Sequence, residues 1–338
     1  MPQSLAEAYD VLLFDLDGVV YIGGIAIPGA PEALREARQA GAHVAYVTNN
    51  ASRTPAAVAA LLEGMGAPVT EADVVTSAQA AARLLADELP PKSKVLVIGA
   101  TALRLAVRER GLVPVSTARE NPAAVVQGFG PGVDYGNLAE GGLAVNAGAL
   151  FVATNADSTI PNKLGTAPGN GSLLKVIENA TGATPVVAGK PEPPLHRESV
   201  IRTGARRPLV IGDRLDTDIE AAYNTGTDSL LVLTGVDNPR TATLAPPHRR
   251  PTYIAATLDA LVLPYPEVAA TGSSAACGGW TATLDPSGTL ALTGHGAAID
   301  GLRALTTAAW AASDQRGGLD AAQVAGALDT LAAAGLHI

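Results

Sequence analysis

The stretch VLLFDLDG, residues 11–18, joins a run of four apolar residues to two aspartates and a glycine. Such a run, followed at once by turn residues, is typical of a short strand that is buried on both faces. Side chains alternate along extended backbone, so Asp15 and Asp17 lie on the same side of the sheet. Two carboxylates this close repel each other unless a cation lies between them or one takes a proton. The stretch therefore predicts a charged site at the carboxyl end of a buried strand.

The same pattern recurs along the chain. Further apolar runs that end in polar residues or glycine span residues 43–48, 95–98, 124–127, 149–153, 185–188, 208–211 and 229–233. Between them lie alanine-rich stretches with helical spacing, at residues 31–40, 55–65, 78–88, 101–110, 171–181 and 216–224. Apolar strands that alternate with helices indicate an α/β fold, and we predict a Rossmann-like, doubly wound parallel-sheet core. In such a sheet, chemistry takes place at the carboxyl ends of the strands.

Two further aspartates follow another predicted strand, in the stretch GDRLDTD at residues 212–218. Asp213 and Asp218 add carboxylates to those of Asp15 and Asp17. Hard oxygen ligands at this loose spacing suit Mg²⁺, which binds through one or two carboxylates, water and a substrate phosphate. Aspartate-rich turns also commonly follow strands without binding a metal ion. Polar residues at four strand ends weaken that alternative, and we predict a magnesium site.

A second group of polar residues follows two other predicted strands. Thr48, Asn49 and Asn50 offer a hydroxyl, two amides and backbone N–H groups ahead of a helix, which suits a phosphoryl group. Lys190 ends a strand before the sequence Pro-Glu-Pro, where its charge could balance carboxylates and phosphate. Alone, Gly-Lys-Pro is a weak signal, because neither a glycine-rich cradle nor a following Ser or Thr accompanies the lysine.

Composition limits the partners of the protein. Its 338 residues suffice for two or three domains, and 47% of them are hydrophobic. The net charge of -9 argues against nucleic acid as a partner, because no basic stripe could neutralise a phosphate backbone. No apolar run reaches the roughly 18 residues of a membrane span, and the amino terminus lacks the pattern of a signal peptide. With one cysteine in the chain, we expect a cytoplasmic protein.

The pattern changes after about residue 262. Gly, Ser, Thr and Ala become frequent, and residues 280–284 and 289–292 predict a hairpin around Asp-Pro-Ser-Gly. Two helices are expected near 297–313 and 320–334. We predict a small carboxyl-terminal α+β module over residues 266–338, accessory to the chemistry and serving dimerisation, stability or regulation, because it contains no catalytic constellation.

Four stretches together resemble a known family. FDLDGVV (14–20), VTNN (47–50), GKPEP (189–193) and GDRLDTD (212–218) are similar, in order and strand-end context, to the four motifs of the haloacid dehalogenase superfamily of phosphatases. Three features resemble the branch of nitrophenylphosphatase, phosphoglycolate phosphatase and pyridoxal phosphatase. They are Pro-Gly-Ala at 28–30 after the first motif, the Thr-Asn-Asn form of the second motif, and the sequence Ala-Thr-Asn-Ala-Asp at 153–157. The resemblance implies a Mg²⁺-dependent phosphatase for a small phosphate monoester. From the resemblance we expect glycerol 3-phosphate as the preferred substrate, with phosphoglycolate or nitrophenyl phosphate as alternatives.

The resemblance also implies roles for these residues. Asp15 would attack phosphorus and become an aspartyl phosphate, and Asp17 would act as general acid and then general base. Mg²⁺ would be held by the Asp15 carboxylate, the Asp17 carbonyl and Asp213, with Asp218 close by. The phosphoryl oxygens would be bound by Thr48, Asn49, Asn50 and Lys190, and the Lys190 ammonium would also balance the negative charge of the nucleophile and the phosphate.

Between Asn49 and Lys190 lie 140 residues, far more than one crossover connection needs. In the family, an insertion here is an α/β cap whose loops select the substrate. We therefore predict a catalytic core over residues 1–79 and 187–262 and a cap over 80–186. Candidate specificity residues lie within 155–168, with Asn162 and Lys163 foremost.

Two other classes of function were weighed. A phosphometabolite-binding regulatory protein without activity is disfavoured, because both the nucleophile and the acid are present. A phosphotransferase with a helical cap after the first motif is disfavoured, because too few residues separate Asp15 from Thr48. The sequence leaves a homodimer open.

Overall fold

The computed structural model describes residues 4–162, 165–272 and 274–338. The chain forms two compact units, one made of Met1–His43 with Arg207–Ile338 and the other of Val44–Arg206. The short 3₁₀ helices are Glu71–Asp73, Ala118–Glu120, Pro247–Arg249 and Leu258–Leu261.

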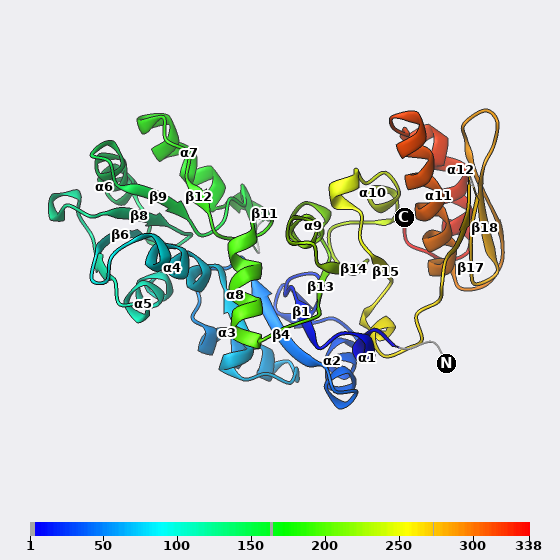
Figure 1. The fold of residues 1–338 in the computed structure, drawn as a ribbon, viewed down its shortest axis with the longest axis horizontal. Helices are drawn as coiled ribbons and strands as arrows, with labels where there is room; N and C mark the ends of the chain where they lie inside the picture. The colour runs from blue at the N-terminus through cyan, green and yellow to red at the C-terminus, as the bar shows by residue number, and fades with distance from the viewer. Residues whose placement is uncertain (1–3, 163–164, 273) are drawn as a thin grey trace. The chain divides into compact units, whose positions relative to one another are not determined.

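The first unit contains a parallel sheet with helices beside it. Its strands lie in the order β15 (Tyr253–Ala255), β14 (Asp228–Val232), β13 (Pro208–Gly212) and β1 (Val11–Phe14). Its short helices are α1 (Leu5–Ala8), α2 (Ala30–Gln39), α9 (Glu220–Thr225) and α10 (Pro239–Thr243). All four residues of β1 are buried, as the apolar run predicts. The prediction of a parallel-sheet α/β core is confirmed (Figure 1).

The turn after β1 places Gly18 against β13. Gly18 has a φ of +82°, and a Cβ there would lie 2.3 Å from Oδ2 of Asp213. Glycine is therefore required for both conformation and space. The chain then forms a hairpin of β2 (Tyr21–Ile22) and β3 (Ile25–Ala26) before it reaches α2.

The segment after β13 differs from the prediction. Instead of a regular helix over 216–224, a π-helical turn over Leu215–Ile219 precedes α9. The carboxylate of Asp218 accepts the Arg214 N–H at 3.3 Å, and the Arg214 carbonyl accepts the N–H of Ile219, five residues later, at 3.2 Å. Wider turns of this kind occur often at functional sites, and sequence periodicity does not reveal them.

The second unit contains two sets of parallel strands. β4 (His43–Thr48) pairs with β5 (Val74–Thr76), and these are accompanied by α3 (Pro55–Gly64), α4 (Ser77–Glu88) and α8 (Pro193–Thr203). A five-stranded sheet has the order β12 (Val186–Val187), β9 (Leu150–Ala153), β8 (Ala124–Gln127), β6 (Lys94–Ile98) and β7 (Val113–Val115). Its helices are α5 (Thr101–Glu109), α6 (Tyr135–Asn146) and α7 (Asn170–Thr181).

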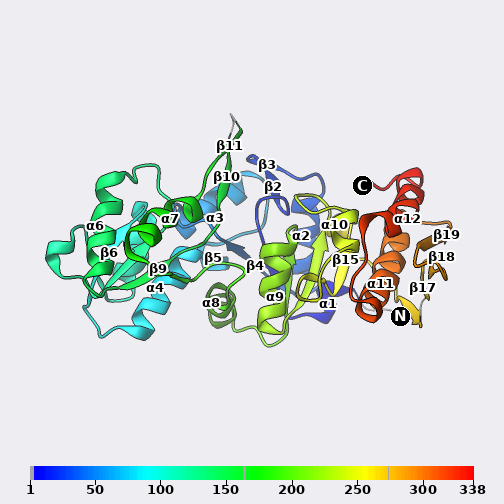
Figure 2. The same cartoon turned by 90° about the horizontal axis from the view of Figure 1, so that it is seen from above.

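An antiparallel hairpin that the sequence did not predict follows β9. It consists of β10 (Thr159–Asn162) and β11 (Gly165–Pro168), and it extends away from the five-stranded sheet (Figure 2). Its residues belong to the stretch that we name above as the candidate specificity loop. Lys163 lies outside the described residues.

A buried carboxylate joins three helical segments of the second unit. Glu198 of α8 is fully buried and pairs with Arg110 at 2.7 Å, with Arg202 at 2.5 Å and with Arg83 of α4. Each arginine keeps about a quarter of its side chain exposed, so the three guanidinium groups depend on one carboxylate for their neutralisation within the protein.

We expect Glu198→Gln to lower the free energy of unfolding by about 2–3 kcal/mol, because it leaves three clustered positive charges without their partner. Denaturant unfolding followed by circular dichroism measures this. Glu178→Gln is the control, since Glu178 pairs with the exposed Lys175 and should change stability by less than about 1 kcal/mol. Equal effects of the two substitutions would contradict the structural role of the cluster.

The carboxyl-terminal segment belongs to the first unit. Its antiparallel sheet has the order β16 (Ala269–Thr271), β17 (Ser274–Cys277), β18 (Trp280–Leu284) and β19 (Leu290–Gly294), followed by α11 (Ala298–Arg316) and α12 (Ala321–Ala333). The predicted hairpin and both helices are present. β16 and β17 were missed because Ala, Ser and Thr without larger apolar residues carry little strand signal.

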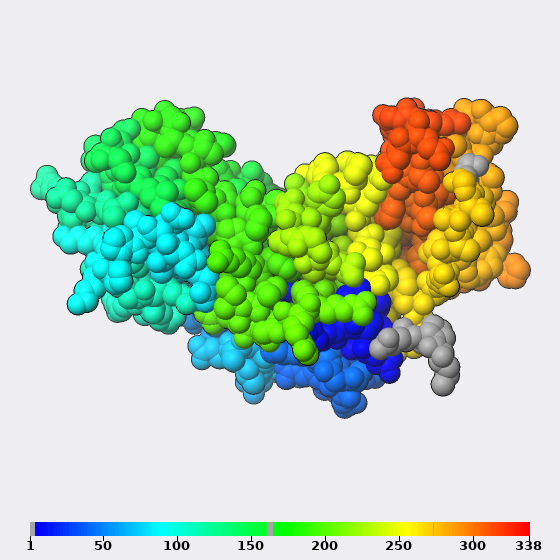
Figure 3. Space-filling model, in the orientation of Figure 1, coloured from blue at the N-terminus to red at the C-terminus, as the bar shows by residue number. Residues whose placement is uncertain are grey.

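This segment shares a hydrophobic core with the residues before it. One cluster of buried side chains contains Leu231 and Ile254 of the parallel sheet together with Leu302 and Leu328 of α11 and α12. In Figure 3 the orange and red surface of the segment adjoins the yellow residues that precede it. The carboxyl-terminal segment and the parallel sheet thus share one cluster of buried side chains.

No helix in the described part of the chain has both the length and the apolar character needed to span a membrane.

Candidate functional site

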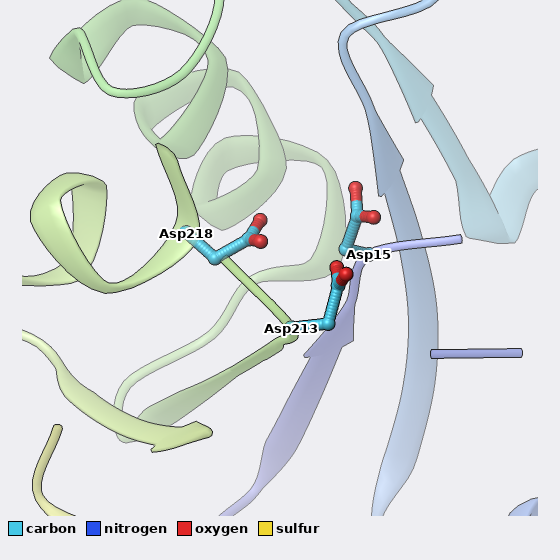
Figure 4. Close-up of side chains that lie close together, drawn as sticks. All are labelled: Asp15, Asp213 and Asp218. Carbon is cyan, nitrogen blue, oxygen red and sulfur yellow. The ribbon is translucent and has the colours of Figure 1, made fainter. Parts of the chain in front are cut away.

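The predicted site residues fall into two groups, one in each unit. In the first unit, Asp15 follows β1, Asp213 follows β13 and Asp218 lies on the π-helical turn. One carboxylate oxygen from each lies within 4.8 Å of the others. Figure 4 shows the three side chains converging from these elements. The strand ends are adjacent because β1 and β13 pair in parallel, and the Asp15 N–H continues the ladder to the Ile211 carbonyl at 2.8 Å.

Asp213 is the most tightly held of the three. It is 1% exposed, and its Oδ2 accepts the Val236 N–H at 2.8 Å. A Cβ at Gly235 would lie 2.0 Å from the same oxygen. Two close backbone approaches, at Gly18 and Gly235, therefore form a cradle that only the Asp213 carboxylate fits.

This donor set fits a hard divalent cation. Three carboxylates within 4.8 Å, two of them almost fully buried, repel one another strongly in the absence of positive charge. Oxygen ligands of this kind and number suit Mg²⁺ better than a metal that prefers nitrogen or sulfur. Asp15, Asp213 and Asp218 are the residues that could hold it.

Asp17 lies apart from this group of three. It is exposed, and the Tyr21 hydroxyl donates to its Oδ2 at 3.3 Å. An exposed carboxyl group is accessible to a substrate from solvent, whereas Asp213 and Asp218 are almost fully buried. Asp15 and Asp17 are only two residues apart, but their surroundings differ. Asp17 is exposed to solvent, whereas Asp15 lies beside two buried carboxylates.

In the second unit, Asn49 and Lys190 are in direct contact. The Asn49 Oδ1 accepts the Lys190 N–H at 2.8 Å, and Nδ2 donates to the Lys190 carbonyl at 3.1 Å. Nδ2 also donates to the Asp157 carboxylate at 3.2 Å. The Asn49 side chain therefore holds the backbone of Lys190, a role that the motif alone did not indicate.

The other polar residues of this group are also engaged. Lys190 is 7% exposed, and its Nζ donates to the Val47 carbonyl at 3.3 Å. The buried Thr48 accepts the Asn50 N–H at Oγ1, at 3.1 Å. The Asn50 side chain caps the next turn, because its Oδ1 accepts the Ser52 N–H at 2.8 Å.

Two further residues, Ser77 and Asn155, support the loop that carries Asn49. The fully buried Ser77 donates from Oγ to the Asn49 carbonyl at 2.6 Å, and Asn155 donates to the same oxygen from Nδ2 at 2.8 Å. Asn155 and Asp157 lie in the stretch that the sequence marks as the candidate specificity loop. Ser77 carries no signal of its own, because a serine at the start of a helix is ordinary.

A nearby histidine carries no charge at neutral pH. Burial lowers the pKa of His196 to about 4, because the charged imidazolium loses its hydration. Its charge cannot contribute to phosphate binding near pH 7.

Comparisons with known proteins agree with this geometry. A family model described as haloacid dehalogenase-like hydrolase matches residues 12–113, and a second HAD-hydrolase-like model matches 187–261. The chain is 48% identical over 259 residues to D-glycerol 3-phosphate phosphatase of Mycobacterium tuberculosis, covering 77% of this chain and 72% of that protein. The chain belongs to the haloacid dehalogenase-like hydrolase family. The resemblance seen in the four motifs is confirmed, and so is the prediction of an enzyme.

Solved structures of haloacid dehalogenase-like hydrolases extend the comparison. Glycerol phosphate phosphatase from M. tuberculosis in complex with magnesium matches with a TM-score of 0.83 and 40% identity over 98% of this chain and 99% of that one. A 4-nitrophenylphosphatase from Thermotoga maritima matches with a TM-score of 0.71 and 28% identity over 77% and 98%. Both agree with the predicted branch.

One match was not foreseen from the sequence. Residues 277–336 match a model described as a GCN5-related N-acetyltransferase-like domain. The match covers β18, β19 and both helices of the carboxyl-terminal segment.

Proposed function

We propose that this protein is a Mg²⁺-dependent phosphatase that hydrolyses a small phosphate monoester, with glycerol 3-phosphate as the preferred substrate. The observation that carries the proposal is the group of Asp15, Asp213 and Asp218 at the ends of β1 and β13. It occurs in a chain that matches the magnesium complex of a glycerol phosphate phosphatase along nearly its whole length. Nitrophenyl phosphate is a secondary substrate, supported by the likeness to 4-nitrophenylphosphatase. Phosphoglycolate remains the other alternative.

In the proposed reaction, a carboxylate oxygen of Asp15 attacks phosphorus. The P–O bond to the alcohol breaks, and Asp17 donates a proton to the departing oxygen. Asp17 then removes a proton from water, which attacks the aspartyl phosphate and releases phosphate while restoring Asp15. The exposure of Asp17 supports this role, because a group that exchanges protons with a leaving alcohol and with water needs access to both.

Bound Mg²⁺ would supply positive charge that offsets the negative charge of the transferring phosphoryl group. The Asp15 and Asp213 carboxylates and the Asp17 carbonyl would hold the ion, with Asp218 close by. The cradle around Asp213 supports this assignment, because it fixes that carboxylate before the ion arrives.

The residues of the second group bind phosphoryl oxygens of the substrate. Thr48, Asn49 and Asn50 contribute the hydroxyl and backbone N–H groups, and the Lys190 ammonium balances charge. The hydrogen bonds from Asn49 to the Lys190 backbone support a division of labour, in which the Asn49 side chain positions the lysine.

We keep the predicted organisation as part of the proposal. Residues 1–79 and 187–262 are the catalytic core, 80–186 are the cap, and 266–338 are the carboxyl-terminal module. The cap loop at 155–168, with Asn162 and Lys163, selects the substrate. We also propose a cytoplasmic protein without a nucleic-acid partner, and a homodimer stays open.

The test is phosphate release from a panel of small esters in the presence of Mg²⁺. We expect kcat/KM for glycerol 3-phosphate to exceed that for phosphoglycolate and nitrophenyl phosphate by at least about 10-fold, the discrimination that a few side chains provide. Removal of Mg²⁺ with EDTA should abolish release, and restoring Mg²⁺ should recover it. Turnover of no ester in the panel would favour the regulatory alternative instead.

A further inference from the structure

The loop that follows β14 is hydrogen-bonded to the turn that carries Asp213. The Val236 N–H donates to Oδ2 of Asp213 at 2.8 Å, and the Asp237 N–H donates to the Asp213 carbonyl at 3.0 Å. The Asp237 carboxylate accepts the Leu215 N–H at 2.6 Å. The side chain and carbonyl of Asp213, together with the N–H of Leu215, are therefore held by two consecutive residues.

The same loop also reaches the first motif. The Thr234 hydroxyl donates to the Gly18 carbonyl at 2.5 Å. One short segment, residues 234–237, thus contacts the turns that follow both β1 and β13, and we call it the clamp loop. The motif comparison in the sequence does not include it.

The clamp loop leads directly into α10. Asn238 caps this helix, with its Oδ1 accepting the Arg240 and Thr241 N–H groups at 3.0 and 3.1 Å. At the other end of α10, the Ala242 carbonyl accepts the indole N–H of Trp310 at 3.0 Å. Trp310 belongs to α11, so a hydrogen bond from the carboxyl-terminal segment fixes the helix that follows the clamp loop.

Apolar packing joins the same parts. Leu215 and Ile219, which flank Asp218 on the π-helical turn, belong to the buried cluster that contains Ala242 of α10 and Leu305 of α11. Trp310 packs against this cluster. The carboxyl-terminal helices therefore support the metal-site turn from its apolar side, while the clamp loop holds its polar side.

From these contacts we propose that Asp237 is a positioning residue for Asp213, and that α11 braces the clamp loop through Trp310. The carboxyl-terminal segment then contributes to cation affinity without touching the cation or the substrate. The inference rests on the proposed function for the identity of the cation. It gives the carboxyl-terminal module, expected to serve dimerisation, stability or regulation, a specific structural task.

The first test measures the binding of Mg²⁺ alone to the full chain by isothermal titration calorimetry. Asp237→Ala removes the acceptor for Leu215 and should weaken Mg²⁺ binding by about 10-fold or more, as loss of residues that orient metal ligands commonly does. Asp237→Asn retains an acceptor oxygen and should restore most of the affinity. Asp285→Ala is the matched control, since Asp285 also accepts a backbone N–H, that of Thr289 at 2.9 Å, but in the β18–β19 hairpin.

The second test separates the brace from general stability. Trp310→Phe keeps an aromatic ring and removes the indole N–H, and it should weaken Mg²⁺ binding by about 2- to 10-fold, the equivalent of one hydrogen bond. Leu174→Ala removes a buried side chain of α7, which belongs to a cluster that contains none of these residues, and should lower the melting temperature without changing Mg²⁺ affinity.

The outcomes are distinct. Unchanged Mg²⁺ affinity in both Asp237→Ala and Trp310→Phe would overturn the inference, and so would an equal loss in Leu174→Ala. A wild-type chain that binds Mg²⁺ but hydrolyses no ester would refute the proposed function, while the binding measurements would still decide the role of Asp237. A wild-type chain that binds no Mg²⁺ would overturn both proposals.

Discussion

Asp15→Asn is expected to lower kcat for phosphate release by at least about 10⁴-fold, the scale seen when an enzyme loses its nucleophile. An amide is uncharged and does not attack phosphorus, so the aspartyl phosphate cannot form. The substitution preserves shape. It also removes one of three negative charges from a group whose oxygens lie within 4.8 Å, so it relieves repulsion instead of adding strain. The folded state should therefore survive, and steady-state phosphate release with saturating Mg²⁺ measures the effect.

Asp216→Asn provides the matched control for this prediction. Asp216 lies in the same acidic stretch as Asp218, but its carboxylate pairs with Arg214 at 2.9 Å and is 45% exposed. We expect its kcat to stay within a few-fold of wild type. Equal rates for Asp15→Asn and the wild type would remove Asp15 from the role of nucleophile.

Gly235→Ala is expected to lower kcat/KM by at least about 100-fold, because it displaces a metal ligand without changing one. A Cβ at this position would lie 2.0 Å from Oδ2 and 2.5 Å from Cγ of Asp213, far inside contact distance. Asp213 is 1% exposed and has no room to withdraw, so either the carboxylate or the clamp loop must move. A displacement of about 1 Å among catalytic groups can cost this much. Activity titrated against Mg²⁺ should show a weaker apparent affinity as well.

Gly132→Ala is the control for the cost of replacing a glycine. No atom lies within 4 Å of a Cβ built there, so the added methyl group meets open space. Its activity and Mg²⁺ dependence should match the wild type. If Gly235→Ala behaved in the same way, the cradle around Asp213 would have no part in the reaction.

The strands and the acidic site could be read from local sequence for a simple reason. A parallel strand buried on both faces needs a continuous apolar run, and its carboxyl end opens into the crevice where polar residues collect. The apolar runs at 11–14 and 208–211 therefore predicted both strands, and the aspartates that follow each run predicted the acidic site. That Asp15 and Asp213 are neighbours required only the parallel pairing of β1 with β13.

The local signal was insufficient where conformation depends on distant partners. A π-helical turn forms at Leu215–Ile219, where the Ile219 N–H donates to the Arg214 carbonyl five residues earlier, and no periodicity of apolar residues in the sequence indicates it. The side chain of Asn49 turned out to hold Lys190, although 140 residues separate them in the sequence. A sequence motif specifies the residue types at a site, but it does not show which of these residues hydrogen-bond to one another.

The sequence alone thus specified an α/β core of parallel strands, the acidic residues at their ends and the family to which the chain belongs. The spacing of apolar residues along the chain depends only on residues that are close in sequence, so strands and helices can be predicted from it. Only the tertiary structure decided that Gly235 and Asp237 hold Asp213 in place and that Trp310 supports the helix beside them. These contacts join residues 22 to 68 positions apart. Most of them use backbone groups, which every residue possesses, so residue types do not reveal them.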